Sequence, residues 1–292
     1  MQDSNFKEEL TSNNFPFVKM QGAGNDFVIV EMSTGLADVD LHKLAEKLCN
    51  RNFGIGADGL MIVHPSEIAD FRMQIINSDG SEPEMCGNGI RCFAKYVYLS
   101  GKTEKTALEI ETLAGIIRPQ IVEKNGQMQV KVDMGEPILK PELVPVSGFE
   151  GDMVLNQPLK VEDTTFNITT VSMGNPHCII YVDSFENLNF EYWGPKLEAY
   201  TQAFPKKINV EFVKVEDENN LHVKVWERGA GPTLACGTGA CAVLTSSVLN
   251  NKAGKKANVH LPGGTLEIEW LENNRIFMTG PAEVSFTGFF NL

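Results

Sequence analysis

The sequence has few of the features that mark nucleic-acid-binding, membrane-spanning or secreted proteins. Its 25 Lys and Arg residues are outnumbered by 38 Asp and Glu residues, and the resulting net charge of −13 disfavours binding to phosphate backbones or anionic membranes. No apolar run is long enough to cross a bilayer. Residues 1–14 are polar and acidic, without the basic and apolar regions of a signal peptide. We therefore expect no nucleic-acid partner, no membrane partner and a cytoplasmic location.

Cysteine is scarce as well, and its spacing excludes several kinds of site. Six cysteines in 292 residues are too few for a disulfide framework, which fits a reducing compartment. No Cys-x-x-Cys pair occurs, which disfavours a zinc finger or a thioredoxin-like centre. No other spacing of Cys, His and acidic residues makes a convincing metal cluster, and no motif marks a lysine for pyridoxal phosphate. We expect neither a metal nor a cofactor.

The most informative pattern is a Cys-Gly-x-Gly sequence that occurs at 86–89 and again, 150 positions later, at 236–239. Apolar residues at helical spacing follow each copy, which predicts a helix after each turn. A cysteine at a helix N-terminus lies among unpaired backbone N–H groups, which make its thiol reactive and can also bind an anion. The pattern indicates two thiols that serve one anionic ligand. The other cysteines are expected to be buried and structural: Cys49, Cys92, Cys178 and Cys241.

A duplication extends over much of the chain. A shift of 150 residues aligns Asn25 with Asn175, Gly59 with Asn209, Asn77 with Glu227 and Cys86 with Cys236. After the Gly-x-Gly turn the shift becomes 149 and aligns Cys92 with Cys241. Two similar strand-rich halves, each with a central helix, make a cleft at their interface, where ligand sites are common. We expect Cys86 and Cys236 to face each other across that cleft.

The chain length fits two domains, and a cluster of prolines within 133–145 marks their boundary. We predict an N-terminal extension over 1–14, a first half over 15–135 and a second half over 136–281. Hydrophobic periodicity in the first half predicts a helix over 41–49 and strands over 60–63, 71–76, 107–112, 116–122 and 127–132.

Two facing cysteines without a redox motif suit proton transfer by two bases. One cysteine, as thiolate, removes a proton from one face of a carbon, and the other, as thiol, delivers a proton to the opposite face. The carbon is thereby inverted. Such groups need pKa values near the working pH, and a thiol pKa of about 8.5 that a helix terminus lowers is well placed. The helix N–H groups can bind the neighbouring carboxylate and offset the charge of the developing carbanion.

Four motifs in order resemble the diaminopimelate epimerase family, over the chain from about Phe15 to its end. They lie at 22–27 (Gly-Ala-Gly-Asn-Asp-Phe), 77–89 (Asn-Ser-Asp-Gly-Ser-Glu to Cys-Gly-Asn-Gly), 174–177 (Gly-Asn-Pro-His) and 226–239 (Trp-Glu-Arg-Gly to Cys-Gly-Thr-Gly). The resemblance implies cofactor-independent conversion of LL-2,6-diaminopimelate to the meso isomer, in lysine and peptidoglycan precursor synthesis in the cytoplasm.

The same resemblance implies an α/β (α+β) fold. Its two pseudo-symmetric domains would each be a barrel-like, mostly antiparallel sheet around a central helix, with the active site in the cleft between them. The C-terminal strand, 282–292, would join the first half. Related epimerases are often dimers, so a homodimer is one assembly open to this chain.

Carried over by motif position, the resemblance makes Cys86 and Cys236 the two catalytic acid/base residues. Backbone N–H groups would bind the carboxylate at the reacting carbon, from Gly87, Asn88, Gly237 and Thr238. Five polar residues would hold the substrate, above all its distal amino-acid end: Asn25, Asn77, Asn175, Asn209 and Arg228. His177 and Glu227 would lie near the reacting carbon, where they tune protonation or hold the substrate amine. Gly59 departs from the pattern, because some members carry Gln there.

Other functions compete with this one. Proline racemases and hydroxyproline epimerases usually show Cys-Gly-His-Gly where this chain has Asn88 as the third residue, so Asn88 favours diaminopimelate. Isomerases of the phenazine-biosynthesis type lack the cysteine pair. A non-enzymatic or redox protein that uses a disulfide between Cys86 and Cys236 is a further alternative, against which the lack of Cys-x-x-Cys counts.

Overall fold

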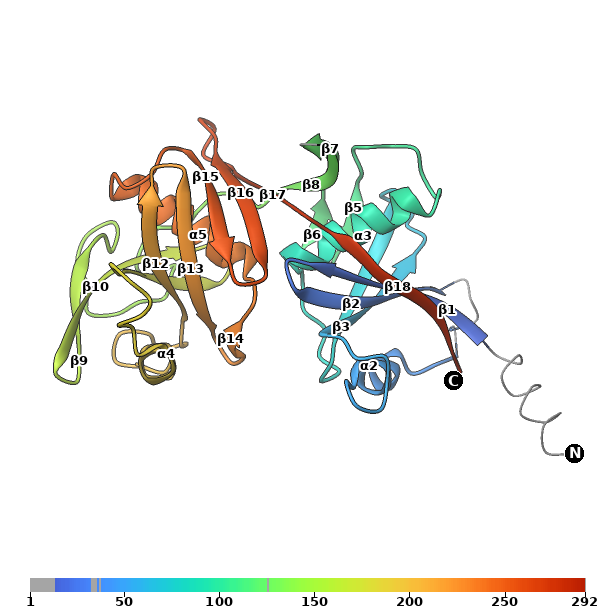
Figure 1. Cartoon of the computed structure of the whole chain (residues 1–292), viewed down its shortest axis with the longest axis horizontal. Helices are drawn as coiled ribbons and strands as arrows, with labels where there is room; N and C mark the ends of the chain where they lie inside the picture. Colours follow the sequence, from blue (N-terminus) through green and yellow to red (C-terminus); the bar gives the residue numbers. More distant parts are fainter. Residues whose placement is uncertain (1–13, 33–35, 37, 125, 292) are drawn as a thin grey trace, which may run out of the picture. The chain divides into compact units, whose positions relative to one another are not determined.

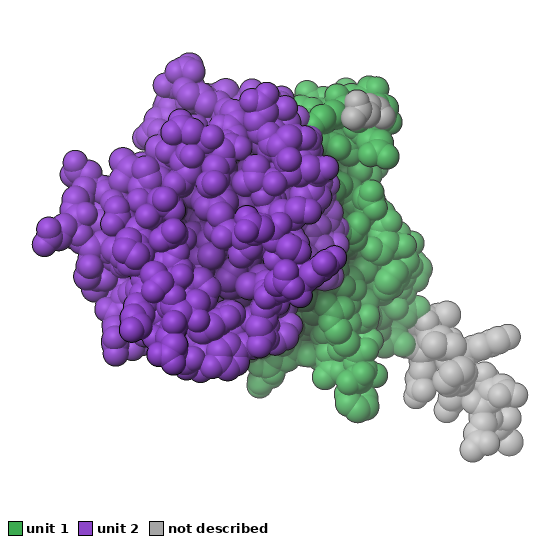
Figure 2. Space-filling model, turned by 60° about the vertical axis from the view of Figure 1, so that its left-hand side comes forward, with its two compact units in different colours: residues 1–130, 281–292 green, residues 131–280 purple. Residues whose placement is uncertain are grey.

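The computed structural model describes residues 14–32, 36, 38–124 and 126–291. Within them the chain forms two compact units, Met1–Val130 with Pro281–Leu292 and Lys131–Gly280 (Figure 2). The extension expected over 1–14 lies outside the described residues, apart from Asn14, where the first strand begins. The functional halves expected over 15–135 with 282–292 and over 136–281 stay a prediction. None of the helices described is both long and apolar enough to cross a membrane.

Unit 1, Met1–Val130 with Pro281–Leu292, contains one mixed sheet and two helices among its described residues. Its elements are β1 (Asn14–Gly22), β2 (Asn25–Glu31), α2 (Leu41–Cys49), β3 (Gly59–His64), β4 (Phe71–Asn77), α3 (Gly87–Leu99), β5 (Ile110–Thr112), β6 (Gly115–Ile117), β7 (Gln120–Lys124) and β18 (Glu283–Asn291) (Figure 1). The strand order of the mixed sheet is β18-β1-β2-β3-β4-β5-β6, and β7 is not part of this sheet. The pairs β2–β3 and β4–β5 are parallel and the others antiparallel, so the sheet is mostly antiparallel as predicted. The chain passes into the second unit within β8 (Gln127–Asp133).

Unit 2, Lys131–Gly280, repeats this plan. Its elements are β9 (Gln157–Val161), β10 (Thr164–Ser172), β11 (Pro176–Tyr181), α4 (Phe190–Glu198), β12 (Asn209–Asp217), β13 (Asn220–Glu227), β14 (Gly231–Thr233), α5 (Gly237–Leu249), β15 (Lys256–Leu261), β16 (Gly264–Trp270) and β17 (Ile276–Gly280) (Figure 1). The strand order runs β17-β16-β15-β13-β12-β11-β10-β9, with β14 paired to β13.

A central helix lies against the sheet in each unit. The contacts of α5 extend across the strand order of the sheet, from β10, β11 and β12 to β15, β16 and β17. A helix enclosed in this way is buried on all sides, and its buried residues run from Gly239 to Ser247 without interruption. In unit 1, α3 buries Ile90, Phe93, Ala94 and Val97, the four residues whose spacing predicted this helix.

The strand pairing reproduces the duplication residue by residue. Phe27 of β2 pairs with Gly59 of β3 in parallel register, and 150 positions later His177 of β11 pairs with Asn209 of β12. Gly59 in turn pairs with Asn77. In unit 2, Val210 and Trp226 pair beside Asn209 and Glu227, the corresponding residues. The shift found in the sequence is therefore also the shift between equivalent places in the two sheets.

Two predicted strands are wrong in extent. The strand expected over 116–122 is divided into β6 and β7 at Arg118 and Pro119. Proline has no N–H for a strand ladder, and the Pro119 carbonyl instead accepts from the backbone N of Leu108 at 3.0 Å. The preceding strand, expected over 107–112, is regular only from Ile110, and Ala107 forms an isolated bridge with Gln120.

Candidate active site

Cys86 is the N-cap residue of α3. Its backbone is extended (φ −135°, ψ 115°), and its Sγ accepts a hydrogen bond from the Gly89 backbone N at 3.4 Å. A cysteine is not a usual cap, and sulfur replaces here the oxygen of the Ser, Thr, Asp or Asn side chain that commonly satisfies this N–H group. The thiol thus lies at the positive end of the helix dipole, which favours a thiolate.

Asn25 holds the other side of the Cys86 thiol. Its Oδ1 accepts from Cys86 Sγ at 3.6 Å and from Asn88 Nδ2 at 3.3 Å, and its Nδ2 donates to Asp58 Oδ2 at 2.6 Å. The Asp58 carboxylate therefore fixes the orientation of the Asn25 amide, because only the Nδ2 side can donate to it. Arg51 in turn bridges Asp58 and Asp26 through 2.8 Å contacts of its Nη2.

Arg91 is a site residue that sequence reasoning missed. It is fully buried on α3, and its Nη1 donates to the Gly87 carbonyl at 3.2 Å and to Asn88 Oδ1 at 3.0 Å. It therefore fixes the first turn of the helix together with the Asn88 side chain. A lone arginine within a helical pattern usually indicates a solvated face, so the sequence carried no signal for this role.

Cys236 repeats the arrangement in unit 2 as the N-cap of α5. Its backbone is again extended (φ −122°, ψ 110°), and its Sγ accepts from the Gly239 backbone N at 3.4 Å and lies 3.5 Å from Thr238 Oγ1. The residue is only 5% exposed. Burial, followed by the charges of Glu227 and Glu211, raises the pKa of the Cys236 thiol well above its ordinary value.

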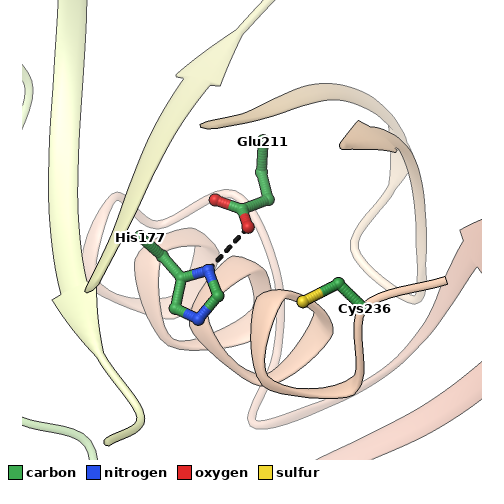
Figure 3. Close-up of side chains that lie close together, drawn as sticks. All are labelled: His177, Glu211 and Cys236. Atoms are coloured by element: carbon green, nitrogen blue, oxygen red, sulfur yellow. Dashed lines mark hydrogen bonds and ion pairs between the residues drawn. The ribbon is translucent and has the colours of Figure 1, made fainter. Parts of the chain in front are cut away.

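A buried imidazole and carboxylate lie beside Cys236 (Figure 3). His177 Nδ1 is 2.6 Å from Glu211 Oε1, and His177 Nε2 is 3.1 Å from Asn175 Oδ1. Neither His177 nor Glu211 has exposed surface. His177 and Asn175 were predicted from the sequence, whereas Glu211 was missed because an acidic residue in an otherwise apolar strand matches no motif.

Glu227, hydrogen-bonded to Thr233, also lies near Cys236. Thr233 Oγ1 donates to Glu227 Oε1 at 2.5 Å. Burial raises the pKa of Glu227, and the Thr233 hydrogen bond and the nearby His177 oppose that shift. A carboxyl group whose pKa is raised toward neutral pH is suited to proton transfer or to binding an amine.

Asn209 and Arg228 are joined to each other rather than to Cys236. Asn209 Nδ2 donates to the Pro176 carbonyl at 2.7 Å, and its Oδ1 accepts from the Arg228 backbone N at 2.9 Å. The Arg228 side chain is exposed and donates to the Lys206 carbonyl at 3.2 Å. In unit 1, Asn77 ends β4 and donates to Ser81 Oγ at 2.9 Å. None of these hydrogen bonds joins Asn209, Arg228 or Asn77 to Cys86 or Cys236.

The residues that gather at Cys236 also include the donor types that bind metals. The nearest ligand-type atoms of His177, Glu211 and Cys236 lie within 4.8 Å of one another. Two of these atoms, Nδ1 and Oε1, already share the 2.6 Å hydrogen bond. We therefore interpret the three residues as an acid–base group. The four other cysteines are buried, as expected: Cys49, Cys92, Cys178 and Cys241.

The fold places the chain in a class of two-unit α/β proteins that includes epimerases. A phenazine biosynthesis protein of the PhzF family from Bacillus anthracis matches with a TM-score of 0.70 at 20% identity, over 96% of this chain and 99% of that one. A hydroxyproline epimerase from Agrobacterium vitis matches with a TM-score of 0.66 at 12% identity, over 97% and 94%. At such identities the likeness concerns the fold alone, and it confirms the predicted fold class.

Sequence comparison narrows this class to one family. The family model described as "Diaminopimelate epimerase" matches residues 17–140 and 169–285. A protein named diaminopimelate epimerase from Desulfitobacterium hafniense is 55% identical over 274 residues, which cover 93% of this chain and 96% of that protein. The chain belongs to the diaminopimelate epimerase family. It is therefore an enzyme of the epimerase class, and the resemblance seen in its motifs is confirmed.

Proposed function

We propose that this enzyme converts LL-2,6-diaminopimelate to meso-diaminopimelate without a cofactor, by proton transfer between Cys86, Cys236 and one α-carbon. The observation that carries the proposal is the equivalence of the two cysteines. Each is the N-cap of the central helix of its unit, and each Sγ accepts from a glycine N at 3.4 Å. The relative from Desulfitobacterium hafniense, named diaminopimelate epimerase, supports the choice of substrate.

The chemistry balances with one thiolate, one thiol and no other reactant. One cysteine, as thiolate, takes the α-proton of the substrate and becomes a thiol, which leaves a carbanion beside the α-carboxylate. The other cysteine, as thiol, gives its proton to the opposite face and becomes a thiolate. The α-carbon is inverted, and the roles of the cysteines are exchanged for the reverse reaction. The carbanion is the high-energy species, so electrostatic stabilisation of it is the main catalytic requirement.

The helix N-termini supply that stabilisation. Backbone N–H groups of the first turn of α3, from Gly87 and Asn88, and of α5, from Gly237 and Thr238, would bind the α-carboxylate. Their donors are fixed before the substrate arrives, because Cys86 and Cys236 cap the same turns. Negative charge that moves from the α-carbon into the carboxylate then meets oriented dipoles without further reorganisation.

Polar side chains would select the rest of the substrate. Arg228 can form a bidentate pair with the distal carboxylate, because its exposed side chain makes no ion pair with any residue that the structure describes. The amides of Asn25, Asn77, Asn175 and Asn209 would contact the two amino-acid ends. Glu227 and His177 would bind the substrate amine or tune protonation near the reacting carbon. The product would serve lysine and peptidoglycan precursor synthesis in the cytoplasm, and a homodimer is included in the proposal.

A proline racemase or hydroxyproline epimerase activity is the alternative, since proteins of that kind share the fold. Asn88, whose amide is held between Asn25 and Arg91, disfavours it, because proteins of that kind usually carry His at this position of the motif. Proton NMR in D2O tests the choice, with reduced enzyme and either LL-diaminopimelate or L-proline. Loss of the α-proton from diaminopimelate alone, with formation of the meso isomer, is the expected result. Exchange of proline alone would contradict the proposal.

A further inference from the structure

The duplicated fold allows the two cysteine sites to be compared position by position. Met61 of β3 and Glu211 of β12 are 150 residues apart and pair with Ile29 and Ile179, respectively, in the same parallel register. Each also touches the first turn of its central helix. A Cβ atom at Gly89 would lie 2.5 Å from Met61 Cε, and a Cβ atom at Gly239 would lie 2.7 Å from Glu211 Oε1. Glu211 therefore stands where the other unit has an apolar side chain.

A residue on the adjacent strand also changes from apolar in unit 1 to polar in unit 2. Phe27 of β2 corresponds to His177 of β11, because each pairs with the residue two places before Met61 or Glu211. Unit 1 thus has a Phe–Met pair where unit 2 has a His–Glu pair. All four side chains are nearly or fully buried. The duplication has kept the backbone and made the surroundings of its two cysteines unequal.

Burial of the Glu211 carboxylate destabilises the folded protein unless other groups compensate for the lost hydration. The residue has no exposed surface, and within the part of the chain that the structure describes its Oε2 has no hydrogen-bond partner. A buried carboxylate oxygen without a partner destabilises the folded state, and more strongly than an unpaired neutral group does. The stabilisation available is the 2.6 Å hydrogen bond to His177 and the positive N-terminus of α5.

We propose that Glu211 is a positioning residue of the Cys236 site: its carboxylate accepts the Nδ1 proton of His177 and keeps Cys236 protonated while no substrate is bound. The proposal rests on the proposed two-base function, in which one thiol must hold a proton to deliver. It goes beyond that function because it assigns the proton-donor state of the free enzyme to one of two cysteines that the helix caps alone leave equivalent.

The charges around Cys236 agree with this assignment. The ionisable groups that face its Sγ are Glu211 on β12, Glu227 on β13 and His177 on β11. Burial and the two carboxylates raise the pKa of the thiol, whereas Thr238 and the Gly239 N–H lower it. A thiolate at Cys236 would therefore share one helix N-terminus with a second anion, and protonation removes that repulsion.

The test is the pH dependence of alkylation of Cys236 by iodoacetamide, followed by mass spectrometry of the peptide that carries it. In Glu211→Gln the midpoint should fall by roughly one pH unit or more, which is about tenfold faster labelling on the rising part of the curve. The matched control is Glu216→Gln, which removes the same charge from an exposed position of the same strand. It should leave the midpoint unchanged.

A merely structural role of Glu211 would give a different result. Because burial itself raises the pKa of the Cys236 thiol, looser packing would lower the midpoint as much in Glu211→Asp as in Glu211→Gln, and this outcome would overturn the proposal. Glu211→Asp keeps the charge and should keep the midpoint near that of the wild type. Labelling requires no substrate, so the two proposals can fail separately. The midpoint shift can be absent while diaminopimelate still exchanges in D2O, and it can be present while diaminopimelate does not exchange.

A measurement on the unaltered enzyme guards against variants that do not fold. The chain has five histidines, so 15N-histidine NMR can resolve His177, assigned by comparison with His177→Gln. We expect Nδ1 to carry a proton near neutral pH. A bare Nδ1 would mean that Glu211 donates the hydrogen bond and is uncharged, which contradicts the proposal.

Discussion

Substitution of Gly239 by alanine should destabilise unit 2, whereas the equivalent change at Gly89 should be nearly neutral in unit 1. Both glycines are in the first turn of a central helix, and both approach a buried side chain from the neighbouring strand. What differs is the atom that the new methyl group meets. The comparison therefore isolates the effect of Glu211 from the general effect of a methyl group at this turn.

The magnitudes follow from the contacts. At Gly239 a Cβ atom would lie 2.7 Å from Glu211 Oε1 and 3.2 Å from Cys236 Sγ. Glu211 cannot retreat easily, because it is fully buried and bonded to His177. Overpacking of this kind costs about 1–3 kcal/mol, and the better helix propensity of alanine returns up to about 1 kcal/mol. We expect a net loss of roughly 1–2 kcal/mol for Gly239→Ala.

At Gly89 the nearest atom is Met61 Cε, the end of a flexible side chain, at 2.5 Å. Methionine can change rotamer to make room, so the propensity gain should roughly cancel the remaining strain. We expect a change within about 0.5 kcal/mol of zero for Gly89→Ala, the usual range for substitutions without a specific penalty.

Urea unfolding measures both changes, because the units can be followed separately. The chain has three tryptophans, Trp193, Trp226 and Trp270, and all lie in unit 2, so their fluorescence reports that unit. Hydrogen exchange of α3 amides reports unit 1. Equal losses in the two variants would refute the view that Glu211 is held rigidly against α5.

Three further predictions concern catalysis and pH. Cys86→Ala and Cys236→Ala should each abolish epimerisation, measured by formation of the meso isomer, and full activity in either variant would exclude the two-base mechanism. Arg228→Lys should raise KM for diaminopimelate by roughly tenfold with little change in kcat, because lysine cannot form a bidentate pair with a carboxylate; a fall in kcat alone would place Arg228 elsewhere in the mechanism. The raised pKa of Cys236 means that its contribution to stability is complete below the ordinary thiol pKa of about 8.5 and is lost as the pH rises above it. The urea midpoint of unit 2 should therefore fall as the pH rises above about 8.5, and less so in Cys236→Ser; an equal fall in both would contradict this role of the Cys236 thiol.

The parts of the fold that could be predicted are those with local signals. The helix over Leu41–Cys49 was predicted to the residue because its apolar residues share one face, and the structure shows that Asp40 caps it. Its counterpart in unit 2, α4, was not predicted, since Gly194 and Pro195 interrupt its helical pattern. Gly194 is required there because a Cβ atom would lie 2.4 Å from the Trp226 ring, a tertiary contact that no local pattern reveals.

The residues of the candidate site likewise fall into those with a local sequence signal and those without one. Cys86 and Cys236 were predicted because a glycine-rich turn before a helix is a local signal and occurs twice. Arg91 and Glu211 were missed because each acquires its role only when other strands or turns surround it. The repeat nevertheless held a signal for Glu211, since its alignment with Met61 replaces an apolar residue with an acidic one within a buried strand.

In the two-base mechanism, two different cysteines serve the two faces of one carbon. Following LL-diaminopimelate in D2O during the first few per cent of conversion tests this mechanism. Two bases place deuterium at the inverted carbon of the meso product, while the remaining LL isomer keeps its α-proton. A single base that serves both faces would place deuterium in the recovered LL isomer as fast as in the product, and that result would contradict the two-base mechanism.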